Sequence, residues 1–577
     1  MLKNLSSCVG KYLRPSILAP LFVSCEVLME VIIPFIMSFI IDDGINAQNM
    51  EVVVKYGLLL VVATLISLMF GVLSGACAAN ASAGFAKNLR QKMFYNVQRF
   101  SFANIDKFST SSLVTRLTTD VTNLQNAYQM IIRIAVRSPV MLIMSLIMAF
   151  RVNVKLSLIF LAAVPILMTG LFLIIRFAHP IFTFVFKLYD NLNNVVRENL
   201  RGMRVVKSFV REDFEENKFK SASDFIYKNF LKAERLLAFN APLMQIASYT
   251  CMLLISWFGA KMIVTSGGVA MTTGQLTILF TYIMQILMSL MMISMIFVMI
   301  TMSKASAQRI NEVLIEEPTI NNPQEPVFEV LDGSIEFENV EFSYKTKPVL
   351  KNINIKINSG ETVGIIGGTG SSKTSLVQLI PRLYDVISGT VKVGGVDVRA
   401  YDIEVLRNSV AMVLQKNELF SGTIKENLRW GNKEASDEEL VKMCKLAQAD
   451  GFIQNFPDKY DTFIEQGGAN VSGGQKQRLC IARALIKRPK ILILDDSPSA
   501  VDTKTDALIR KAFREEIPDT TKIIIAQRIS SVQDADKIIV MNNGCVDAVG
   551  THEELLKTNE IYKEVYTSQV KGGDNNG

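Results

Sequence analysis

With 577 residues the chain is too long for one hydrophobic core, so we expect at least two domains. Hydrophobic residues make up 49% of it and its mean hydropathy is positive, which excludes an ordinary soluble protein. The net charge is +7, and the sequence shows no basic stripe with interleaved aromatic residues. We therefore expect anchoring at an anionic membrane face and no nucleic-acid partner. Seven scattered cysteines without a CxxC pair are typical of a reducing compartment and indicate no metal site.

The first half of the chain has the pattern of a membrane domain. Residues 1–16 place Lys3, Lys11 and Arg14 among apolar neighbours and predict an amphipathic elbow helix on the membrane surface. Six apolar stretches follow, each long enough to cross a bilayer, which takes about 20 helical residues. They lie near residues 17–41, 55–79, 134–150, 156–176, 241–264 and 276–302. We therefore predict a six-helix transmembrane domain over residues 17–310.

Two long polar segments, residues 80–133 and 177–240, separate these stretches and are rich in lysine and arginine. The positive-inside rule places both segments and both chain termini in the cytoplasm, which predicts a multi-pass protein of the plasma (inner) membrane. We expect the two segments to form long helical extensions of the transmembrane domain.

Glu26 and Glu30 lie inside the first apolar stretch, four residues apart and therefore on one helix face. Carboxylates are costly in a membrane helix and usually face an interior or water. One interpretation is a cation-attracting spot in a translocation cavity. The other is a hydrated lateral opening or a position near the interface.

The last apolar stretch carries a stripe of methionines at helical spacing. Core packing is the usual role of such a stripe, and it is one interpretation here. The other is a deformable surface of a substrate cavity, formed by Met288, Met295 and Met299, that accommodates varied apolar ligands.

A change in composition marks the boundary between the two halves. Pro318, Pro323 and Pro326 fall in a polar stretch, so we predict a linker at residues 311–333. Alternating strand and helix patterns follow over residues 334–570, and residues 571–577 form a Gly/Asn-rich tail that we expect to be disordered.

A glycine-rich turn lies between an apolar strand at residues 362–366 and a helix that begins near Ser375. Its residues are Gly367, Gly368, Thr369, Gly370, Ser371, Ser372, Lys373 and Thr374. Backbone N–H groups of such a turn and the helix dipole bind an anion. We expect Lys373 to reach the outer phosphates of a nucleotide and the Thr374 hydroxyl to hold Mg²⁺.

Further motifs surround this turn. Tyr344 follows the first strand and could stack on a purine ring, with ordinary packing as the alternative. A Ser-Gly-Gly turn that begins a helix is itself an anion-binding device. Downstream motifs at predicted strand ends or helix starts are Gln415, the run Ser472, Gly473, Gly474 and Gln475, then Asp495, Asp502 and Gln527. Asp495 ends a buried strand, where its carboxylate could join the Mg²⁺ shell.

These motifs resemble those of an ABC (ATP-binding cassette) exporter half-transporter, and the resemblance covers nearly the whole chain. It implies a type I exporter-like membrane domain of six transmembrane helices and an α/β P-loop nucleotide-binding domain with a helical subdomain. It implies ATP binding at Tyr344 and residues 367–375, with Mg²⁺ at Thr374, Gln415 and Asp495.

The resemblance also implies roles for residues outside the nucleotide turn. Gln415 would link the nucleotide site to the membrane domain, Ser472–Gln475 would complete a partner's ATP site, and Asp502 would lie at the dimer interface. Segments near 109–120 and 202–211 would cap the long extensions as coupling helices.

The chain departs from the family pattern at two catalytic positions. The family places Glu after the metal-binding Asp, where this chain has Asp496, and His where it has Gln527. A carboxylate displaced by about 1 Å can cost 10²-fold in rate. A glutamine can donate a hydrogen bond but carries no positive charge. Ser372, at a usual glycine position, adds a smaller departure.

We therefore expect a site that binds ATP and hydrolyses it poorly, beside an intact signature run. This combination predicts the degenerate-site half of a heterodimeric multidrug-type exporter, which moves amphipathic or apolar small molecules by alternating access. An importer on the same fold, for example for a metal chelate, and an ATP-gated channel or regulatory subunit are the alternatives.

Overall fold

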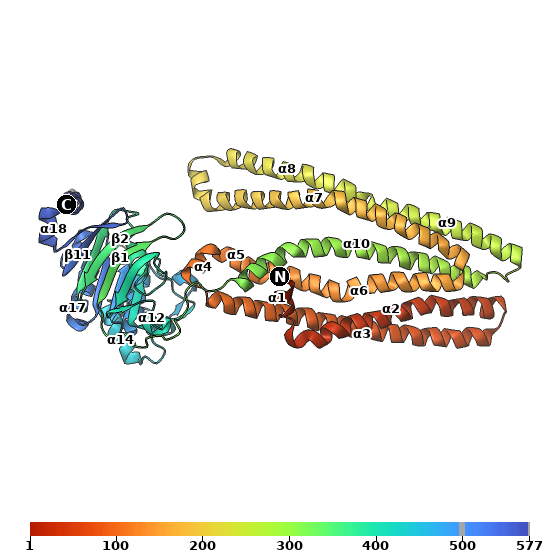
Figure 1. The fold of residues 1–577 in the computed structure, drawn as a ribbon, viewed down its shortest axis with the longest axis horizontal. Coiled ribbons are helices and arrows are strands. Elements are labelled where there is room, and N and C mark those ends of the chain that lie inside the picture. Colours follow the sequence, from red (N-terminus) through yellow and green to blue (C-terminus); the bar gives the residue numbers. More distant parts are fainter. Residues whose placement is uncertain (496–501, 575–577) are drawn as a thin grey trace. The chain divides into compact units, whose positions relative to one another are not determined.

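The computed structural model describes residues 1–495 and 502–574 and divides the chain into two compact units (Figure 1). The first, here called the helical unit, comprises Met1–Gln98 and Ser109–Glu316. The second, here called the α/β unit, comprises Arg99–Phe108 and Glu317–Gly577. A ten-residue segment from the N-terminal half therefore belongs to the C-terminal unit.

The helical unit is built from long helices joined by short turns. Its elements are α1 (Leu2–Ser6), η1 (Gly10–Tyr12), α2 (Leu13–Phe39), the π-helical turn η2 (Ile40–Asn46), α3 (Met50–Gln98), α5 (Thr110–Thr115), the π-helical turn η3 (Arg116–Asp120), α6 (Val121–Val152), α7 (Val154–Ser208), α8 (Glu212–Ala238), α9 (Asn240–Ser266) and α10 (Thr273–Ile315).

Within the described residues, six helices are long and apolar enough to cross a membrane. They are Gly10–Asn46, Met50–Gln98, Thr110–Val152, Val154–Val185, Glu212–Ser266 and Thr273–Ile315. Helices satisfy all their backbone hydrogen bonds internally, which is why apolar segments of this length span a bilayer in this form. The predicted six-helix membrane domain is confirmed.

Local sequence signals set the ends of these helices. The Asn153 side chain accepts from the Leu156 amide at 3.1 Å and caps α7. Thr272 and Gln275 form a capping box at the start of α10. Gly267, with φ of 60°, ends α9 in the left-handed conformation that glycine favours.

The core of the helical unit lies between α2, α6, α7, α9 and α10. Fully buried side chains such as Val31, Phe160 and Leu279 form it. The Tyr282 hydroxyl donates to the Val31 carbonyl at 2.9 Å, so even its buried polar group has a partner across the α2–α10 contact.

The N-terminal segment is two short helical pieces rather than one elbow helix. Helix α1 ends at Ser6, and Gly10, with φ of 50°, interrupts the helical backbone before α2 begins at Leu13. The Asn88 side chain donates to the Cys8 carbonyl at 2.9 Å and fixes this break against α3.

The first long polar segment turns earlier than expected. Helix α3 ends at Gln98, and the short helix α4, Phe102–Lys107, follows it within the α/β unit. Residues 109–120, which we expected to cap this extension, lie in the helical unit as α5 and η3.

The reason is a buried carboxylate that pairs with α10. Asp120 is 1% exposed and accepts from Ser306 Oγ at 2.8 Å and from Arg309 Nε at 2.7 Å, both on α10. Arg116 reaches Glu312 of the same helix at 2.9 Å. Residues 116–120 are thus held along α10 and cannot form the turn.

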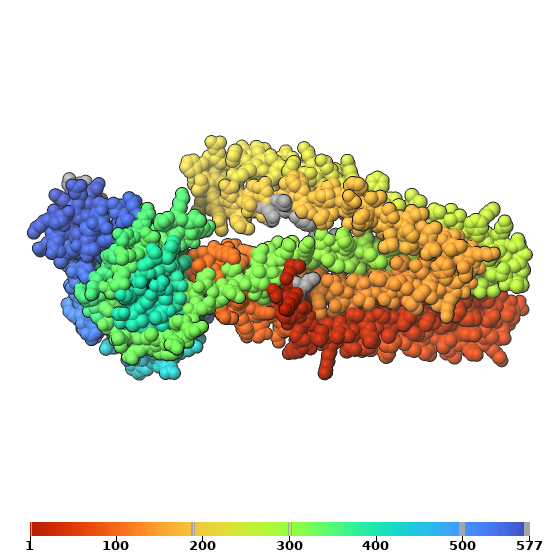
Figure 2. All heavy atoms as spheres, in the orientation of Figure 1, coloured from red at the N-terminus to blue at the C-terminus, as the bar shows by residue number. Residues whose placement is uncertain are grey.

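The second long polar segment turns within the expected range. Helix α7 ends at Ser208 and α8 begins at Glu212, so the turn falls inside residues 202–211. Helices α7 and α8 lie side by side (Figure 1). In the space-filling view, this yellow pair stands apart from the green helix α10 toward the end that carries the turn (Figure 2).

The α/β unit contains two main sheets in its described residues. A four-stranded antiparallel sheet has the order β2-β1-β4-β5, and a six-stranded sheet has the order β12-β11-β3-β10-β9-β6. Strands β11, β3, β10, β9 and β6 are mutually parallel, and β12 is antiparallel to β11. Their bounds are β1 Ile335–Phe342, β2 Leu350–Ile357, β3 Thr362–Gly367, β4 Ser388–Val393, β5 Val396–Asp397, β6 Val410–Val413, β9 Ile491–Asp495, β10 Thr521–Ile525, β11 Lys537–Asn542 and β12 Cys545–Gly550.

Helices complete this unit, and a group of short ones forms a helical subdomain with the small β7–β8 pair. Besides α4, the α-helices outside that subdomain are α11 (Lys373–Gln378), α12 (Ile403–Ser409), α16 (Gly473–Ile486), α17 (Thr503–Glu516), α18 (His552–Thr558) and α19 (Glu560–Asp574). The subdomain comprises β7 (Gly422–Thr423), α13 (Ile424–Leu428), α14 (Asp437–Leu446), α15 (Asp450–Ile453) and β8 (Phe463–Ile464). Helix α19 extends to Asp574, four residues into the stretch that we expected to be a disordered tail.

Candidate functional site

Four strand ends place the predicted nucleotide motifs along one edge of the six-stranded sheet. Strands β3, β10, β9 and β6 are parallel, so their C-terminal ends meet at the same edge. The glycine-rich turn follows β3, Asp495 ends β9, and Gln415 and Gln527 come two residues after β6 and β10. Open α/β sheets bind ligands at this edge of the strands.

The turn after β3 has the backbone of a phosphate loop. A Cβ on Gly367 would clash with the Met541 carbonyl oxygen, and Gly370, with φ of 83°, needs the left-handed region. Lys373 Nζ donates to the carbonyls of Gly367 at 2.8 Å and Gly368 at 3.0 Å. The loop thus curls around the lysine ammonium, which places positive charge where phosphate oxygens would bind.

Ser372 occupies a strained position in this loop. It occupies the N-terminal flank of α11 without a side-chain capping bond, and its φ of 70° and ψ of 25° are a left-handed conformation that costs non-glycine residues roughly 1–2 kcal/mol. This explains physically why the family pattern has glycine there. The backbone path survives the substitution, at the cost of stored strain.

The fold brings Thr374 and Asp495 together. The Thr374 hydroxyl donates to Asp495 Oδ1 at 3.0 Å, and Asp495 is 1% exposed. A hydroxyl and a carboxylate are hard oxygen donors, and Mg²⁺ in nucleotide sites uses one or two carboxylates together with phosphate oxygens. The two groups therefore fit this ion. Gln415 is exposed beyond β6 on the same edge.

Tyr344 lies just after β1 and is held by the phosphate-loop helix. Its hydroxyl lies 2.9 Å from Ser375 Oγ and donates to Gln378 Oε1 at 3.2 Å, both on α11. The side chain remains 46% exposed. An aromatic ring anchored by its hydroxyl and otherwise open to solvent can stack on a purine base.

Gln527 lies at the exposed tip of β10, and a residue that sequence reasoning missed fixes its backbone. Gln569 of α19 donates from Nε2 to the Gln527 carbonyl at 2.8 Å, and its Oε1 accepts from the Ile529 amide at 2.9 Å. The position belongs to no motif, so only the fold reveals it. His552 contacts Tyr562 through its ring nitrogen at 2.7 Å, between α18 and α19.

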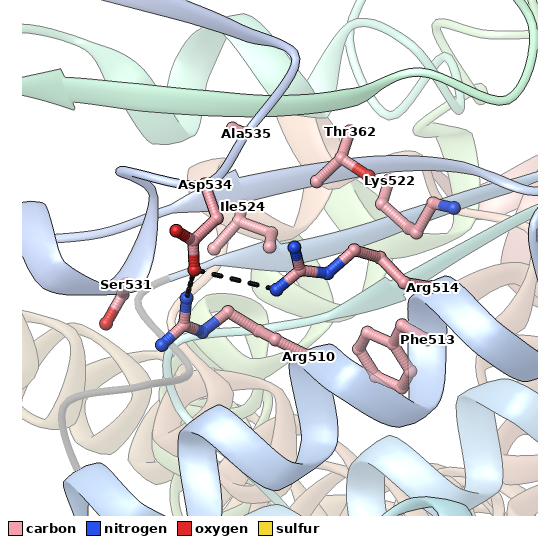
Figure 3. A pocket seen from close by; sticks show the side chains of 9 residues that line it. All are labelled: Thr362, Arg510, Phe513, Arg514, Lys522, Ile524, Ser531, Asp534 and Ala535. Carbon is pink, nitrogen blue, oxygen red and sulfur yellow. Dashed lines mark hydrogen bonds and ion pairs between the residues drawn. The ribbon is translucent and has the colours of Figure 1, made fainter. Parts of the chain in front are cut away.

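A polar network connects α17, which follows Asp502, to η7 (Ile529–Ser531), which follows Gln527. Buried Asp506 accepts from Ser531 Oγ at 3.1 Å and from Arg510 Nε at 3.2 Å. Burial raises the pKa of the Asp506 carboxyl. Arg510 and Arg514 both pair with Asp534, at 3.2 and 3.5 Å, beside a small pocket (Figure 3).

The run Ser472–Gln475 opens α16 with a capping box. Ser472 Oγ accepts from the Gln475 amide at 3.3 Å, and Gln475 Oε1 accepts from the Ser472 amide at 2.9 Å. Ser472 and Gly473 are exposed, and a Cβ on Gly473 would meet nothing within 4 Å. The start of this helix is therefore open to solvent, and a second molecule could approach it.

Asp502 caps α17 by accepting from the Thr505 amide at 2.9 Å. This hydrogen bond, with a contribution from the Arg478 charge, holds the pKa of the Asp502 carboxyl below its usual range. Asp496 lies outside the residues that the structure describes.

In the helical unit, Glu26 and Glu30 share a partner that the sequence did not reveal. Arg137 of α6 contacts Glu26 Oε1 at 2.5 Å and Glu30 Oε1 at 2.6 Å. Glu26 is 8% exposed, so its charge is buried as well as paired. The guanidinium offsets one of the two negative charges, and the cluster joins α2 to α6 as an ion pair instead of presenting two bare carboxylates.

The methionine stripe of α10 faces away from the core of this chain. Met288 is 54% exposed and Met295 is 57% exposed, whereas Leu279, Tyr282 and Ile283 on the same helix are buried. Met299 is partly exposed. Packing within this chain is therefore not the role of Met288 and Met295.

Comparisons with known proteins agree with this geometry. The family described as "ABC transporter transmembrane region" matches residues 16–312, and the family described as "ABC transporter" matches residues 350–499. An uncharacterised ABC transporter ATP-binding protein of Bacillus subtilis, YfiB, is 37% identical, with 94% of each chain covered. The ATP-dependent lipid A-core flippase of Desulfotalea psychrophila is 33% identical, with 84% of each chain covered.

A solved structure shares the fold over both units. It is a bacterial Atm1-family ABC exporter with ATP bound, which superposes with a TM-score of 0.80 at 23% identity and covers 97% of this chain and 98% of that chain. The chain thus combines six apolar helices with an α/β unit that matches the ABC transporter family, and relatives match it over 94% of its length. The chain belongs to the ABC transporter family, as a multi-span half-transporter with one transmembrane and one ATP-binding domain.

Proposed function

We propose that this chain is the degenerate-site subunit of a heterodimeric ABC exporter for apolar or amphipathic small molecules. It lies in the plasma membrane, with both termini and the nucleotide-binding domain in the cytoplasm. Residues 17–310 form its transmembrane domain, 311–333 its linker and 334–570 its nucleotide-binding domain, to which we add residues 99–108.

This chain's own site binds ATP. Tyr344 stacks on the base, the N–H groups of residues 367–375 and Lys373 bind the phosphates, and Thr374, Asp495 and Gln415 hold Mg²⁺. The ion would neutralise phosphate charge there. The hydrogen bond of 3.0 Å from the Thr374 hydroxyl to Asp495 Oδ1 supports this assignment, because it brings two oxygen ligands together.

Gln527 carries the proposal of weak hydrolysis. It lies at the end of β10, on the sheet edge that bears the phosphate loop, where the family has His. Its amide can donate a hydrogen bond to a phosphate oxygen, but it cannot supply a positive charge. The sequence adds a second loss at Asp496, whose side chain is one methylene shorter than the usual Glu.

The intact Ser472–Gln475 run supports an asymmetric pair. Its exposed helix start would contact ATP held by the phosphate loop of a partner that carries the usual Glu and His. Asp502 would lie at the same interface. A site with weak hydrolysis on one chain and a competent site on the other gives one working turnover per cycle.

Exposed aromatic rings on the α8 extension support a partner subunit. Phe214, Phe219, Phe225 and Tyr227 are 45–64% exposed in this chain. A cluster of exposed aromatic side chains on a water-facing surface usually marks a surface that a second molecule covers. The turn at Phe209 and Val210, 72% and 80% exposed, is the proposed second coupling segment.

The substrate class rests on α10 and on one relative. The exposed face that bears Met288, Met295 and Met299 provides polarizable, flexible side chains for varied apolar ligands. A relative named as a lipid A-core flippase moves an amphipathic molecule, which is compatible with that class.

ATPase activity of the chain alone, and then of the chain with its partner, tests the proposal. We expect little activity alone, robust activity together, and loss when the partner's catalytic Glu is replaced by Gln. Ser472→Ala in this chain should remove most activity of the pair, because it damages the competent site. Stable homodimers with normal turnover would overturn the proposal, and substrate flux in inverted vesicles gives the direction of transport.

A further inference from the structure

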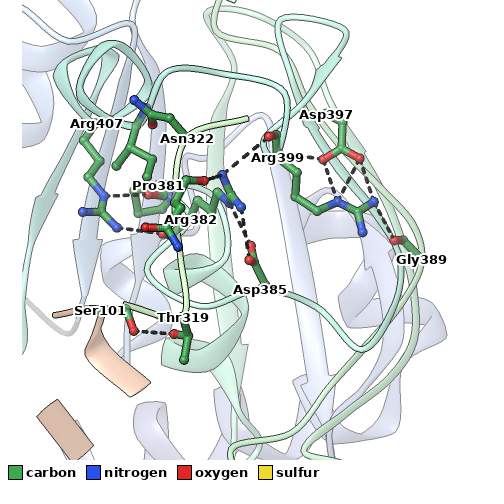
Figure 4. A network of polar contacts seen from close by, with 12 residues as sticks. Ser101, Thr319, Asn322, Pro381, Arg382, Asp385, Gly389, Asp397, Arg399 and Arg407 are labelled. Carbon is green, nitrogen blue, oxygen red and sulfur yellow. Dashed lines mark hydrogen bonds and ion pairs between the residues drawn. The ribbon is translucent and has the colours of Figure 1, made fainter. Parts of the chain in front are cut away.

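Helix α4 is anchored to the α/β unit by residues 317–319, at the start of the unit's second segment. Asn104 donates to the Glu317 carbonyl at 3.0 Å and accepts from the Thr319 amide at 3.2 Å. The Ser101 and Thr319 hydroxyls lie 2.5 Å apart (Figure 4). Through these bonds α4 belongs to the unit that binds ATP, although it directly continues the chain after α3.

Tyr384 connects α4 to the interior of the unit. Its hydroxyl donates to Asp106 Oδ2 at 2.6 Å, and its ring lies edge-on to Phe102, with centroids 6.0 Å apart. Tyr384 is 9% exposed, and burial together with the Asp106 charge raises the pKa of its hydroxyl. The hydroxyl therefore stays protonated and makes a charge-assisted hydrogen bond at physiological pH.

The other side of Tyr384 contacts the residue that we assign to the adenine base. The rings of Tyr344 and Tyr384 pack edge to face, with centroids 5.1 Å apart and an interplanar angle of 88°. Phe342 packs against both rings. Ser375 and Gln378 hold the Tyr344 hydroxyl, and Tyr384 together with Phe342 sets the tilt of the Tyr344 ring.

The backbone that carries Tyr384 is held on several sides. Arg382, buried and with φ of 50°, donates to Asp385 at 2.8 Å and to the Asn321 carbonyl at 3.3 Å (Figure 4). Arg407 donates to the Arg382 carbonyl at 2.9 Å. The backbone at Tyr384 is thus fixed, so the position of its ring depends on its own contacts, namely the hydrogen bond to Asp106 and the packing against neighbouring rings.

We propose that Tyr384 is a positioning residue that couples α4 to base recognition at Tyr344. The Asp106–Tyr384 hydrogen bond holds the ring against which Tyr344 packs, so that docking of α4 and binding of the adenine base stabilise each other. Coupling of this kind is reciprocal: if α4 favours the base, the base favours the docked α4. This inference rests on the proposed role of Tyr344 in ATP binding.

Binding to the full-length pair, with the P-loop lysine of the partner replaced so that only this chain's site is measured, tests the coupling. The probes are ATP and inorganic tripolyphosphate, which has phosphates and no base. Tyr384→Phe and Asp106→Ala should each raise the Kd for ATP about fivefold, the size expected for one lost hydrogen bond, and leave the Kd for tripolyphosphate unchanged.

Tyr401→Phe is the matched control. Tyr401 is also buried and also makes one hydroxyl hydrogen bond, to the Val393 carbonyl at 2.7 Å, in the same unit. It should leave both affinities unchanged. An equal loss of ATP and tripolyphosphate affinity in Tyr384→Phe would show general damage and would overturn the coupling, as would no loss of either.

Hydrogen exchange gives the reciprocal readout. ATP should slow amide exchange in residues 99–108 of the wild-type chain, tripolyphosphate should not, and the ATP effect should vanish in Tyr384→Phe. Tyr344→Ala separates the two proposals. If it lowers ATP affinity selectively while Tyr384→Phe is silent, only the coupling fails. If Tyr344→Ala has no selective effect, the base-binding role and the coupling fail together.

Discussion

Gln569 and Gln527 are joined side chain to backbone, with Gln569 Nε2 donating to the Gln527 carbonyl at 2.8 Å. Because the other end of the same amide accepts from Ile529, one side chain clamps the backbone on both sides of Arg528. The C-terminal helix therefore fixes the end of β10, where the family has its switch histidine.

Replacing Gln569 by Ala should loosen that end of β10. Two hydrogen bonds of about 1 kcal/mol each are lost at an exposed site, so we expect ATP to leave this chain's site several-fold faster. Release of a fluorescent ATP analogue from the pair measures this rate. Ser568→Ala, on the same helix, is the control and should release ATP at the wild-type rate. Equal rates for Gln569→Ala and wild type would contradict the clamp.

Ser372→Gly should relieve the strain in the phosphate loop. The left-handed backbone costs serine roughly 1–2 kcal/mol, and the greater freedom of glycine in the unfolded chain offsets part of the gain. We expect Ser372→Gly to be more stable to heat than Ser372→Ala, which keeps the strain. Thermal unfolding of the two variants, with and without ATP, makes the comparison. A more stable alanine variant would show that the serine backbone is not strained.

Asp495→Asn should remove the Mg²⁺ dependence of ATP binding while keeping the fold. The amide has the same size and can still accept from the Thr374 hydroxyl, but it carries no charge to hold the ion. ATP affinity measured with and without Mg²⁺ should differ strongly in the wild type and little in the variant. If the ion still strengthens ATP binding by the wild-type factor, Asp495 is not its ligand.

Removing Arg137 should destabilise the helical unit. Arg137→Leu leaves Glu26 and Glu30 without their cation, and an uncompensated buried charge costs about 3–5 kcal/mol. Adding Glu26→Gln and Glu30→Gln to Arg137→Leu should recover most of the loss, because no charge then remains. Thermal stability of the purified protein in detergent measures both variants, and no recovery in the triple variant would show that packing rather than charge is lost.

The buried Asp506 should make stability depend on pH. Burial raises its pKa above the unfolded value, so its favourable contribution is complete at low pH and is lost as pH rises through the folded pKa, above about pH 4. Relative to wild type, Asp506→Asn should therefore gain stability as pH rises.

Asp437 provides a control of opposite sign. The hydrogen bond from Lys425 lowers its pKa, so its contribution is present at neutral pH and is lost as pH falls through the folded pKa. Asp437→Asn should lose stability relative to wild type as pH rises. Thermal unfolding across a pH series measures both variants, and parallel profiles for the two would contradict the assignment.

The features that could be predicted are those that neighbouring residues determine. Apolar length alone identified the six spans, and the run from Gly367 to Thr374 between a strand and a helix identified the phosphate loop. Parallel strands then bring Asp495 to Thr374, although 121 residues separate them. Short-range patterns and one topological rule were sufficient for this part of the site.

The features that were missed depend on contacts between distant residues or on backbone angles. Arg137 lies 107 residues from Glu30, and no local pattern marks it as the partner. We expected residues 109–120 to cap an extension, and nothing in the sequence indicated that Asp120 pairs with Arg309 and Ser306 of α10. The left-handed backbone of Ser372 follows from the loop path, which the identity of the residue alone cannot reveal.

The membership of residues 99–108 in the α/β unit has a practical consequence for fragments. A polypeptide that starts at Glu317 would lack Phe102 and Asp106 and would expose the side of Tyr384 that they cover. Nucleotide affinities measured on such a fragment would understate those of the full chain. A synthetic peptide of residues 99–108, added in trans, should restore part of the missing affinity. The smallest fragment with full nucleotide affinity would then consist of two segments that are separate in the sequence.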